Sequence, residues 1–277
     1  MTKKTLSTEQ RTDRPDRPAF HALGLPRSVF FRTKTAASAP LPSPRPDKAE
    51  LARQLRPFEL FAKLPAAVLK EAAAGAQRRL YRQGEFVWQR GDPARQVVLI
   101  DSGFVKAARR DHKGASKTYG LFGPGDSMGL YAFWAGMRYP TDAVALNEGL
   151  SLIILDAAEL NHLAEQHRQL AENLKGEVTR FSEAFINKIE IISAGTIPQR
   201  LAVMMLQLVG RYGVEHQGER ARLPVSLTLE QISEIIGARI ETVARALGHW
   251  KRAGWLVTDA RGCHFDSLNQ LRALLHD

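Results

Sequence analysis

The alternation of apolar and polar positions between residues 227 and 257 predicts two helices joined by a tight turn. Thr228 is a favourable N-cap residue, and Gln231 three positions later completes a capping box for the first helix. Gly237 follows this helix and supplies the backbone freedom that a sharp turn needs. The apolar stripe of the first helix consists of Ile232, Ile235 and Ile236.

The second helix of this pair is expected to end at Gly254. Glu241 and Arg245 are four residues apart, so they share one face of that helix. Residues 255–265 contain two short runs around a turn, which predicts a β-hairpin. Two helices with a trailing hairpin are typical of a winged helix, whose second helix contacts base edges in the DNA major groove. The residues available for the buried side of that helix are Ile240, Val243, Ala246, Leu247 and Trp250.

An alternative for this pattern is a pair of amphipathic helices in another kind of bundle. Glu241 and Arg245 would then form a solvated salt bridge worth about 0.3–0.5 kcal/mol. That alternative requires the helix lengths, the turn glycine, the charge placement and the hairpin to coincide, so we favour the winged helix.

Residues 86–155 contain short apolar runs separated by glycine-rich turns. Many short strands with such turns are typical of a β-sandwich or a β-roll. Short helical turns are expected before them, near residues 58–61 and 64–69. The runs are residues 86–88, 97–100, 104–107, 118–122, 143–146 and 152–155.

Residues 157–195 are predicted to be helical, and in their later part the apolar residues are spaced alternately by four and three. Such a heptad seam indicates a parallel homodimer, and the alternative is a helix that packs only on its own domain. A dimer would double the DNA contacts over two half-sites. The seam residues are Leu174, Val178, Phe181, Phe185, Ile189 and Ile192.

Residues 1–55 are rich in proline and charge and lack apolar periodicity, so we expect a disordered and dispensable tail. The chain has 277 residues and a formal net charge of +10. Residues 1–56 hold 12 Lys and Arg against 5 Asp and Glu, so the high charge belongs mainly to the tail.

The single cysteine, Cys263, excludes an internal disulfide framework and a cysteine-ligated iron–sulfur cluster. No apolar run is long enough to cross a membrane. We therefore expect a cytoplasmic protein without membrane contact.

The chain resembles the Crp/Fnr family of bacterial transcription regulators over roughly residues 57–277. The order of roll, long helix and winged helix is that of the family, and the Glu241–Arg245 pair lies where the family contacts DNA. The resemblance implies a homodimer that binds double-stranded DNA, contacts RNA polymerase and acts most commonly as an activator. The other matching segments are residues 91–94 (Gly-Asp-Pro-Ala), 101–103 (Asp-Ser-Gly), 123–129 (Gly-Pro-Gly-Asp-Ser-Met-Gly) and 199–202 (Gln-Arg-Leu-Ala).

We accordingly expect an α+β fold in four parts. Residues 1–55 are the tail, and residues 56–165 form a β-roll of the cyclic-nucleotide-binding, jelly-roll kind. Residues 166–195 form the dimerisation helix, and residues 196–277 form the winged helix-turn-helix domain.

The residues that bind cyclic AMP in this family are replaced here. The cyclic-AMP receptor has a glutamate, an arginine and a serine at these positions. By the resemblance, the corresponding residues of this chain are Leu130, Pro140 and Thr141. A leucine cannot accept a bond from a ribose hydroxyl, and a proline cannot neutralise a cyclic phosphate. Phe185 and Ile186 replace a pair of hydroxyl residues that touch the adenine. Neither cyclic AMP nor the four-cysteine cluster of the oxygen-sensing branch is expected, and no cofactor is predicted.

Three alternatives remain for the signal: an apolar or aromatic ligand, haem, and no ligand at all. The candidate pocket lining suits an apolar ligand, although the same side chains could fill the space themselves. Haem would need an axial histidine, and His112 lies in a segment typical of an exposed turn. The candidate lining is Gly129, Leu130, Tyr131, Pro140, Thr141, Phe181 and Phe185.

Arg245 is expected to hold a guanine, and Glu241 to accept a bond from a cytosine amine. Ile240 favours a thymine methyl, and Ala244 has no hydroxyl with which to add a preference. The resemblance to the Crp/Fnr family, whose sites share a TGA core, implies an inverted repeat of a TTGA-like element with half-sites about 10–11 bp apart, centre to centre. The phosphate contacts are assigned to Thr228, Arg239, Lys251 and Arg252.

Two rival functions remain. A roll can be a cupin-like metal-dependent enzyme, but such enzymes need several His or carboxylate ligands inside the barrel. The predicted strands offer none at suitable spacing, and no Walker loop, nucleophile elbow or His-Glu-x-x-His motif is present, so no catalytic or metal site is predicted. A dimeric interaction module would leave Glu241 and Arg245 without a role. Retarded migration of a palindromic DNA by the purified protein separates DNA binding from both rivals.

Overall fold

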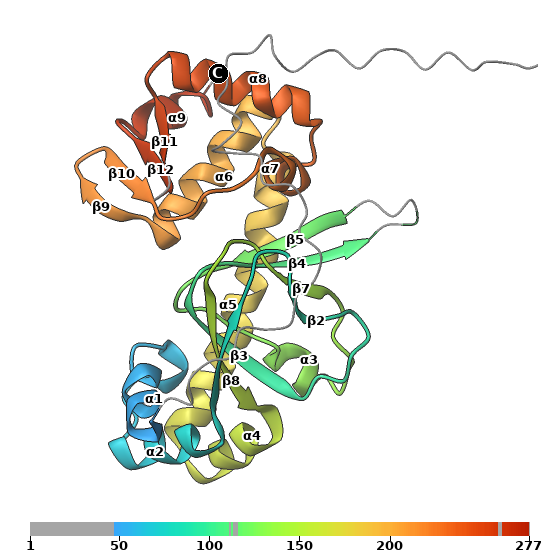
Figure 1. Ribbon diagram of the computed structural model, residues 1–277, viewed down its shortest axis with the longest axis vertical. Coiled ribbons are helices and arrows are strands. Elements are labelled where there is room, and N and C mark those ends of the chain that lie inside the picture. The colour runs from blue at the N-terminus through green and yellow to red at the C-terminus, as the bar shows by residue number, and fades with distance from the viewer. Residues whose placement is uncertain (1–46, 111, 113–115, 260–261, 277) are drawn as a thin grey trace, which may run out of the picture.

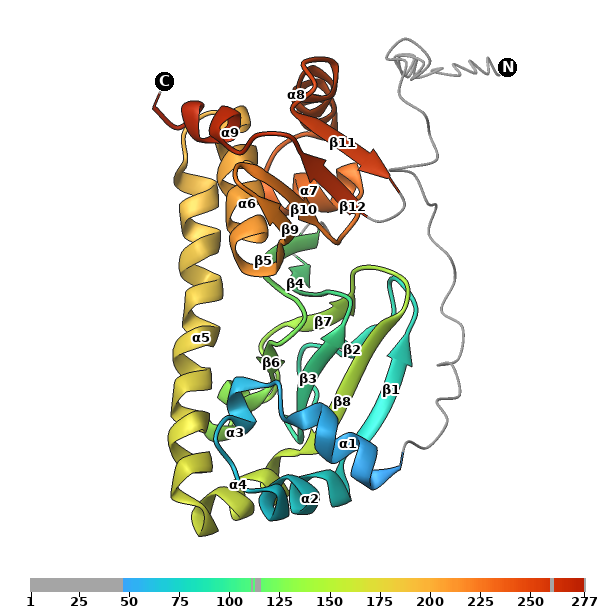
Figure 2. The same ribbon diagram turned by 90° about the vertical axis from the view of Figure 1, so that its left-hand side faces the viewer.

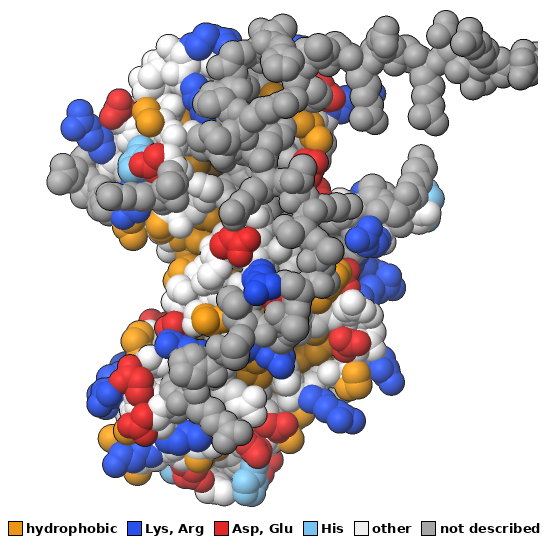
Figure 3. Space-filling model, viewed as in Figure 1, with side chains coloured by type: hydrophobic (Ala, Val, Ile, Leu, Met, Phe, Trp, Pro, Cys, Tyr) orange, Lys and Arg blue, Asp and Glu red, His pale blue; other side chains and the backbone are white. Residues whose placement is uncertain are grey.

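The computed structural model describes residues 47–110, 112, 116–259 and 262–276. A β-roll lies at one end and a winged-helix domain at the other, and the long helix α5 (Arg168–Ser193) runs along both (Figures 1 and 2). The space-filling view narrows between the two ends (Figure 3). Among the described helices, none combines the length and the apolar character that crossing a membrane requires.

The roll consists of two four-stranded sheets, with strand orders β1-β8-β3-β6 and β2-β7-β4-β5. Successive residues of a strand point to opposite faces. In β3, Val98 and Ile100 therefore enter the apolar cluster between the sheets, while Val97 and Leu99 enter a second cluster under the helices. The strands are β1 (Gln77–Tyr81), β2 (Phe86–Trp88), β3 (Gln96–Ser102), β4 (Val105–Arg110), β5 (Ser116–Phe122), β6 (Ser127–Met128), β7 (Asp142–Ala145) and β8 (Leu150–Asp156).

Each of the predicted apolar runs overlaps one of these strands, but the sequence pattern predicts neither β1 (Gln77–Tyr81) nor the two-residue β6 (Ser127–Met128). Among the described strands, β1 lies at the edge of its sheet and pairs with β8 alone. Edge strands commonly carry charged residues that discourage further pairing, and β1 contains Arg78 and Arg79. Its polar composition therefore hides it from a search for apolar runs.

Helices cover the outer face of the first sheet and bury the second apolar cluster. The cluster contains Phe61 of the short helix η2 and Leu174 of α5. The helices of the roll are α1 (Lys48–Leu55), η2 (Glu59–Phe61), α2 (Ala66–Gly75), α3 (Leu130–Trp134) and α4 (Ala157–Gln166).

The structure corrects the expected tail, because residues 48–55 form α1 (Lys48–Leu55). The carboxylate of Asp47 caps this helix by accepting a hydrogen bond from the backbone N–H of Ala49 (3.2 Å). Leu51 and Leu55 are buried in the helical cluster. The roll domain therefore begins near residue 47 rather than 56, and the rest of the expected tail, residues 1–46, lies outside the described residues.

The C-terminal domain has the predicted winged-helix order. Thr228 caps α7 and forms the capping box with Gln231, and Gly237 has a left-handed φ of 68° in the turn before α8. The predicted hairpin is formed by β11 and β12, within a sheet of order β11-β12-β10-β9. The elements are α6 (Ile197–Tyr212), β9 (Val214–Gln217), β10 (Arg220–Leu223), α7 (Leu229–Ile236), α8 (Ile240–Arg252), β11 (Leu256–Asp259), β12 (Gly262–Phe265) and α9 (Asn269–Ala273).

Candidate DNA interface and effector region

The exposed face of α8 carries the two side chains expected to contact bases. Glu241 and Arg245 are both exposed and lie one helical turn apart. His249 lies one turn further along and is also exposed. The sequence analysis does not include His249, although its spacing of four residues from Arg245 places it on the same face of the helix. The opposite face of α8 is buried through Val243, Leu247 and Trp250.

The packing of α8 contradicts the expected base contact of Ala244 and restricts that of Ile240. Ala244 is only 4% exposed and belongs to the core of the winged-helix domain, so it is not available to a base. Ile240 is half-buried and packs against the same core. The face of α8 that can meet DNA is therefore narrower than the sequence pattern indicated.

The residues assigned to phosphate contacts are placed in different ways. Arg239 and Arg252 are exposed at the two ends of α8. Thr228 accepts a hydrogen bond at its hydroxyl from the backbone N–H of Gln231 (3.1 Å) as the cap of α7. Lys251 is half-buried and its amine donates to the hydroxyl of Thr258 on β11 (2.8 Å), which connects α8 to the wing. Burial lowers the pKa of Lys251.

Some residues of the expected dimer seam on α5 are exposed, and others pack against the roll of the same chain. Leu174 is 1% exposed in the helical cluster of the roll, which removes it from the seam. Ile189 is 59% exposed and Ile192 is 41% exposed. Ile186, at 53% exposure, is a further apolar residue on the outside of α5 that the sequence analysis did not assign to the seam. The second half of α5 thus presents an uncovered apolar stripe.

Aromatic rings pack together where the family resemblance places an effector pocket. Phe181 of α5 stacks on Phe122 of β5 with ring centres 5.9 Å apart, and on Tyr131 of α3 at 5.5 Å. Phe185 meets Phe181 edge-on at 5.0 Å. These four rings come from three different elements and pack on one another. Phe122 is buried, Phe181 and Phe185 are half-buried, and Tyr131 is 42% exposed.

The remaining pocket candidates differ in how they are packed. Gly129 has a φ of 100°, and a Cβ there would lie 2.4 Å from the carbonyl oxygen of Gln96, so only glycine fits. Leu130 is 5% exposed and belongs to the helical cluster rather than to the cluster of Phe181, which removes it from the pocket lining. Pro140 and Thr141 are half-buried and directly precede β7.

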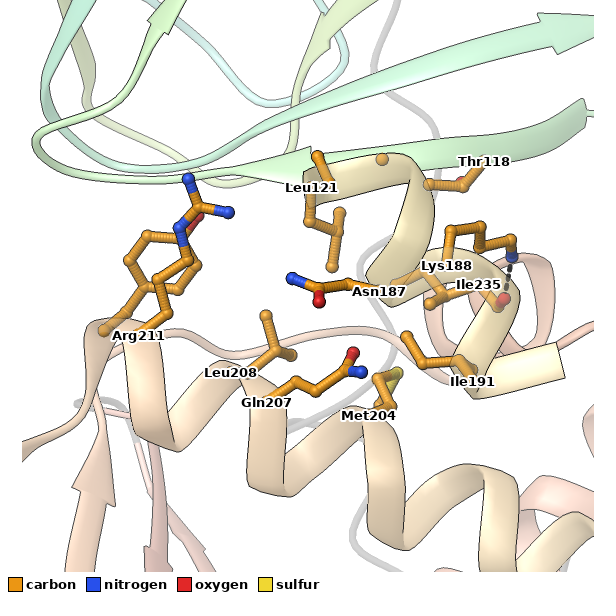
Figure 4. Close-up of a pocket in the computed structure, with 13 residues that line it drawn as sticks. Thr118, Leu121, Asn187, Lys188, Ile191, Met204, Gln207, Leu208, Arg211 and Ile235 are labelled. Atoms are coloured by element: carbon orange, nitrogen blue, oxygen red, sulfur yellow. Dashed lines mark hydrogen bonds between the residues drawn. The ribbon is translucent and has the colours of Figure 1, made fainter. Parts of the chain in front are cut away.

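A small cavity lies where the roll, α5 and the winged-helix domain meet (Figure 4). Its volume of about 40 Å³ is far below the roughly 300–1,000 Å³ of typical small-molecule sites. The amide of Gln207 points into it and donates to the carboxylate of Glu190 (2.7 Å), while its buried oxygen has no partner among the described residues. The cavity suits ordered water between the helices rather than a nucleotide.

Lys188 connects α5 to α7, the first helix of the helix-turn-helix pair. Its amine donates to the backbone carbonyl of Ile235 in the last turn of α7 (Figure 4). Burial lowers the pKa of Lys188 from 10.5 to about 8, and the charge of Glu234 partly offsets this effect. A cation at a helix C-terminus is favourable, so the contact offsets part of the cost of burying the charge.

Within the part of the chain that the structure describes, no three His, Cys, Asp or Glu side chains gather in an arrangement that could hold a metal ion. The only cysteine, Cys263, is buried, and burial raises the pKa of its thiol to about 12.

Two family models match the chain, one on each end. The model of the cyclic nucleotide-binding domain matches residues 78–167, which contain the strands of the roll. The model of the Crp-like helix-turn-helix domain matches residues 199–274, which contain α7, α8 and the wing.

Known transcription regulators are similar to this chain. The CRP-like cAMP-activated global transcriptional regulator of Mycobacterium tuberculosis is 29% identical over 182 residues, which cover 65% of this chain and 80% of the relative. The transcriptional activator protein Anr of Pseudomonas aeruginosa is 26% identical over 200 residues, covering 71% and 79%. These relatives are transcription regulators and not enzymes.

The fold of the chain is also found in solved structures. FixK2 from Bradyrhizobium japonicum superposes with a TM-score of 0.63 at 22% sequence identity, covering 72% of this chain and 96% of that chain. At this identity the likeness shows the arrangement of roll, long helix and helix-turn-helix domain.

Proposed function

The chain belongs to the Crp/Fnr family of DNA-binding transcription regulators, and from that premise we propose that it acts as a homodimer on an inverted DNA repeat. The observation that carries the proposal is the exposed face of α8, where Glu241 and Arg245 lie one turn apart above a buried opposite face. A guanidinium can hold the O6 and N7 atoms of a guanine, and a carboxylate can accept from a cytosine amine. This pair supports a TTGA-like half-site.

The dimer half of the proposal rests on α5. Ile186, Ile189 and Ile192 are large apolar side chains exposed on one helix, and soluble proteins seldom leave such a stripe uncovered. Pairing two copies along α5 would cover it and place one winged-helix domain on each side of the axis. Val178 and Phe185 are half-buried, precede the stripe along α5 and are expected to extend the contact.

We further propose that cyclic AMP is not the signal of this regulator. The M. tuberculosis relative is cAMP-activated by name, but here Leu130 is buried in the helical cluster and Phe181 stacks between two other rings. No side chain at Leu130 or Pro140 can bind a ribose or a phosphate. A self-filled aromatic cluster favours regulation without a ligand in this space.

The remaining parts of the proposal follow from the family. Contact with RNA polymerase and a role as activator are the commoner family pattern, and the bacterial cytoplasm is the compartment in which such a regulator would meet DNA. Transcription in vitro from a promoter that carries the selected site, with and without the protein, determines the sign of regulation.

The decisive experiment is a selection from random DNA with the purified full-length chain. We expect an inverted repeat with TTGA-like half-sites, and retarded migration of that duplex by the wild-type protein. The matched control is the double variant Glu241→Ala/Arg245→Ala, which should keep its dimer mass and lose the preference. A selection that returns no palindrome, or a preference that survives in the double variant, contradicts the proposal.

A further inference from the structure

The winged-helix domain is held on the roll of the same chain by a carboxylate. Asp126 accepts hydrogen bonds from the guanidinium Nη2 of Arg211 (2.7 Å) and from the hydroxyl of Tyr212 (2.6 Å). It also accepts from the backbone N–H of Gly123 within its own turn (2.8 Å). Arg211 and Tyr212 are the last residues of α6, so this one side chain joins the roll to the first helix of the winged-helix domain.

Close apolar packing surrounds this bridge. The rings of Phe104 and Tyr212 meet edge-on with centres 5.1 Å apart. A Cβ at Gly123 would lie 2.6 Å from the ring of Phe104 and 2.8 Å from that of Tyr212, so the approach requires glycine. Burial raises the pKa of the Tyr212 hydroxyl, which therefore remains a donor to Asp126. Burial alone would lower the pKa of Arg211, but Tyr212 and Asp126 raise it above its ordinary value.

A second bridge holds the helix-turn-helix pair itself. The carboxylate of Glu234 on α7 accepts from the amine of Lys106 (2.5 Å) and from the hydroxyls of Ser116 (3.2 Å) and Thr118 (3.4 Å). All three donors lie on β4 and β5, which form a hairpin of the roll. Together with the bridge at Asp126, this contact holds both α6 and α7 of the winged-helix domain on the roll.

These bridges would affect DNA binding because they fix the position of α8 relative to α5. In the proposed dimer, α5 sets the two-fold axis, and the orientation of α8 relative to α5 sets the distance and angle between the two DNA-contacting helices. One base pair more between half-sites moves one of them by about 3.4 Å and turns it by about 35° around the DNA axis. The two bridges, the contact of Lys188 with Ile235 and a hydrogen bond from Gln231 to the carbonyl of Leu146 (2.9 Å) hold the domain, so it cannot follow that change without breaking contacts.

We propose that Asp126 and Glu234 are positioning residues that determine the half-site spacing which this regulator accepts. The inference rests on the proposed function of a dimer on an inverted repeat and goes beyond it. Neither side chain would touch a base. Both act by holding α8 in one orientation, so they restrict spacing and leave the base preference within a half-site unchanged.

The test uses the full-length chain and a set of duplexes with identical half-sites, whose centre-to-centre spacing changes by one base pair at a time. The variants are Asp126→Asn, Glu234→Gln and the double variant. Asp101→Asn is the matched control, because Asp101 forms an equally short ion pair with Arg78 (2.7 Å) wholly within the roll. Lys106→Arg keeps the charge of the second bridge and should behave as the wild type.

We expect the wild type to lose about tenfold in affinity one base pair away from the best spacing, a loss of the size of a mismatched base pair. For the same change in spacing, the double variant should lose about threefold or less in affinity, and the single variants should lie between it and the wild type. The base preference within a half-site should be unchanged in all of them. The two single variants each keep one bridge, so they decide the matter if the double variant does not dimerise.

Two results would overturn the inference while leaving the proposed function intact. One is a spacing profile in Asp126→Asn and Glu234→Gln that matches the wild type. The other is an equal broadening in Asp101→Asn, which would indicate general loosening of the roll. Failure of the wild type to bind any spacing variant would instead remove the proposed function and the inference together.

Discussion

Arg245 and Ala244 are neighbours in α8 and lie in opposite environments, because Arg245 is exposed while Ala244 is buried in the domain core. Successive residues of an α-helix point about 100° apart, so a helix packed on one face can offer only a narrow strip to DNA. On α8 that strip contains Glu241, Arg245 and His249. The proposed base contacts are therefore Glu241 and Arg245, with Ile240 at the edge of the strip.

Replacing Arg245 with alanine should remove a base contact. We expect Arg245→Ala to weaken binding to the TTGA-like inverted repeat by about 1–3 kcal/mol and to leave binding to random DNA almost unchanged. Arg252→Ala should weaken both and reduce the salt dependence by about one counterion, because it removes a phosphate contact. Fluorescence anisotropy on both duplexes at several salt concentrations measures these effects. Equal losses on the two DNAs for Arg245→Ala would argue against its role at a base.

Placing a charge on the exposed stripe of α5 should separate the dimer. Ile189→Glu leaves the packing within the protomer intact, since Ile189 is an exposed side chain, but would bury a carboxylate between two copies. We expect a folded monomer by analytical ultracentrifugation and loss of binding to the inverted repeat. The exposed Glu183, changed to Gln on the same helix, is the control and should remain dimeric. A dimeric Ile189→Glu variant would place the seam elsewhere.

Removing the N-terminal segment tests where the folded roll begins. Deleting residues 1–46 removes none of the described core, so the free energy of unfolding and the site preference should stay as in the wild type. Deleting residues 1–55 also removes α1 with the buried side chains of Leu51 and Leu55. Each buried leucine contributes about 1.5–3 kcal/mol, so this second truncation should lose several kcal/mol in urea unfolding. Equal stability of the two truncated chains would contradict the structural role of α1.

Titration with cyclic AMP tests the interpretation of the aromatic cluster. We expect no heat of binding in calorimetry at micromolar to millimolar nucleotide and no change in DNA affinity, because Phe181 and its neighbours occupy the space. The M. tuberculosis relative, which is cAMP-activated by name, is the positive control in the same buffer. Saturable binding of cyclic AMP to this chain would show that the rings rearrange to admit it.

The buried amine of Lys188 should make stability depend on pH in a defined direction. Burial lowers its pKa to about 8 in the folded chain, against 10.5 for a free lysine. Between these values the unfolded chain holds a proton that the folded chain has released, so the free energy of unfolding rises with pH in this window. Below pH 8 both states are protonated and the full cost of the buried charge is present.

Comparison with Lys188→Met isolates this contribution, since other groups titrate alike in both proteins. Urea unfolding at pH 7, 8, 9 and 10 should show the wild type gaining stability relative to the variant above pH 8. A difference between the two proteins that stays constant over this range would mean that Lys188 keeps an ordinary pKa in the folded chain.

The sequence by itself determined the elements whose signals are local. The capping box of Thr228 and Gln231, the left-handed turn at Gly237 and the apolar runs of the roll depend on neighbours a few residues away, and each is found as predicted. The pairing of Glu241 with Arg245 on one face of α8 follows from helical spacing alone.

Only the tertiary structure decided which side of each helix is covered. Heptad spacing cannot distinguish a seam between copies from a face packed on the same chain. It therefore predicts Leu174 in the dimer seam although the roll buries this residue, and it does not include Ile186 although that residue is exposed. Ala244 and Leu130 were misplaced for the same reason. Burial depends on residues distant in the chain, and the bridges from Asp126 to Tyr212 and from Glu234 to Lys106 span 86 and 128 positions that no local pattern connects.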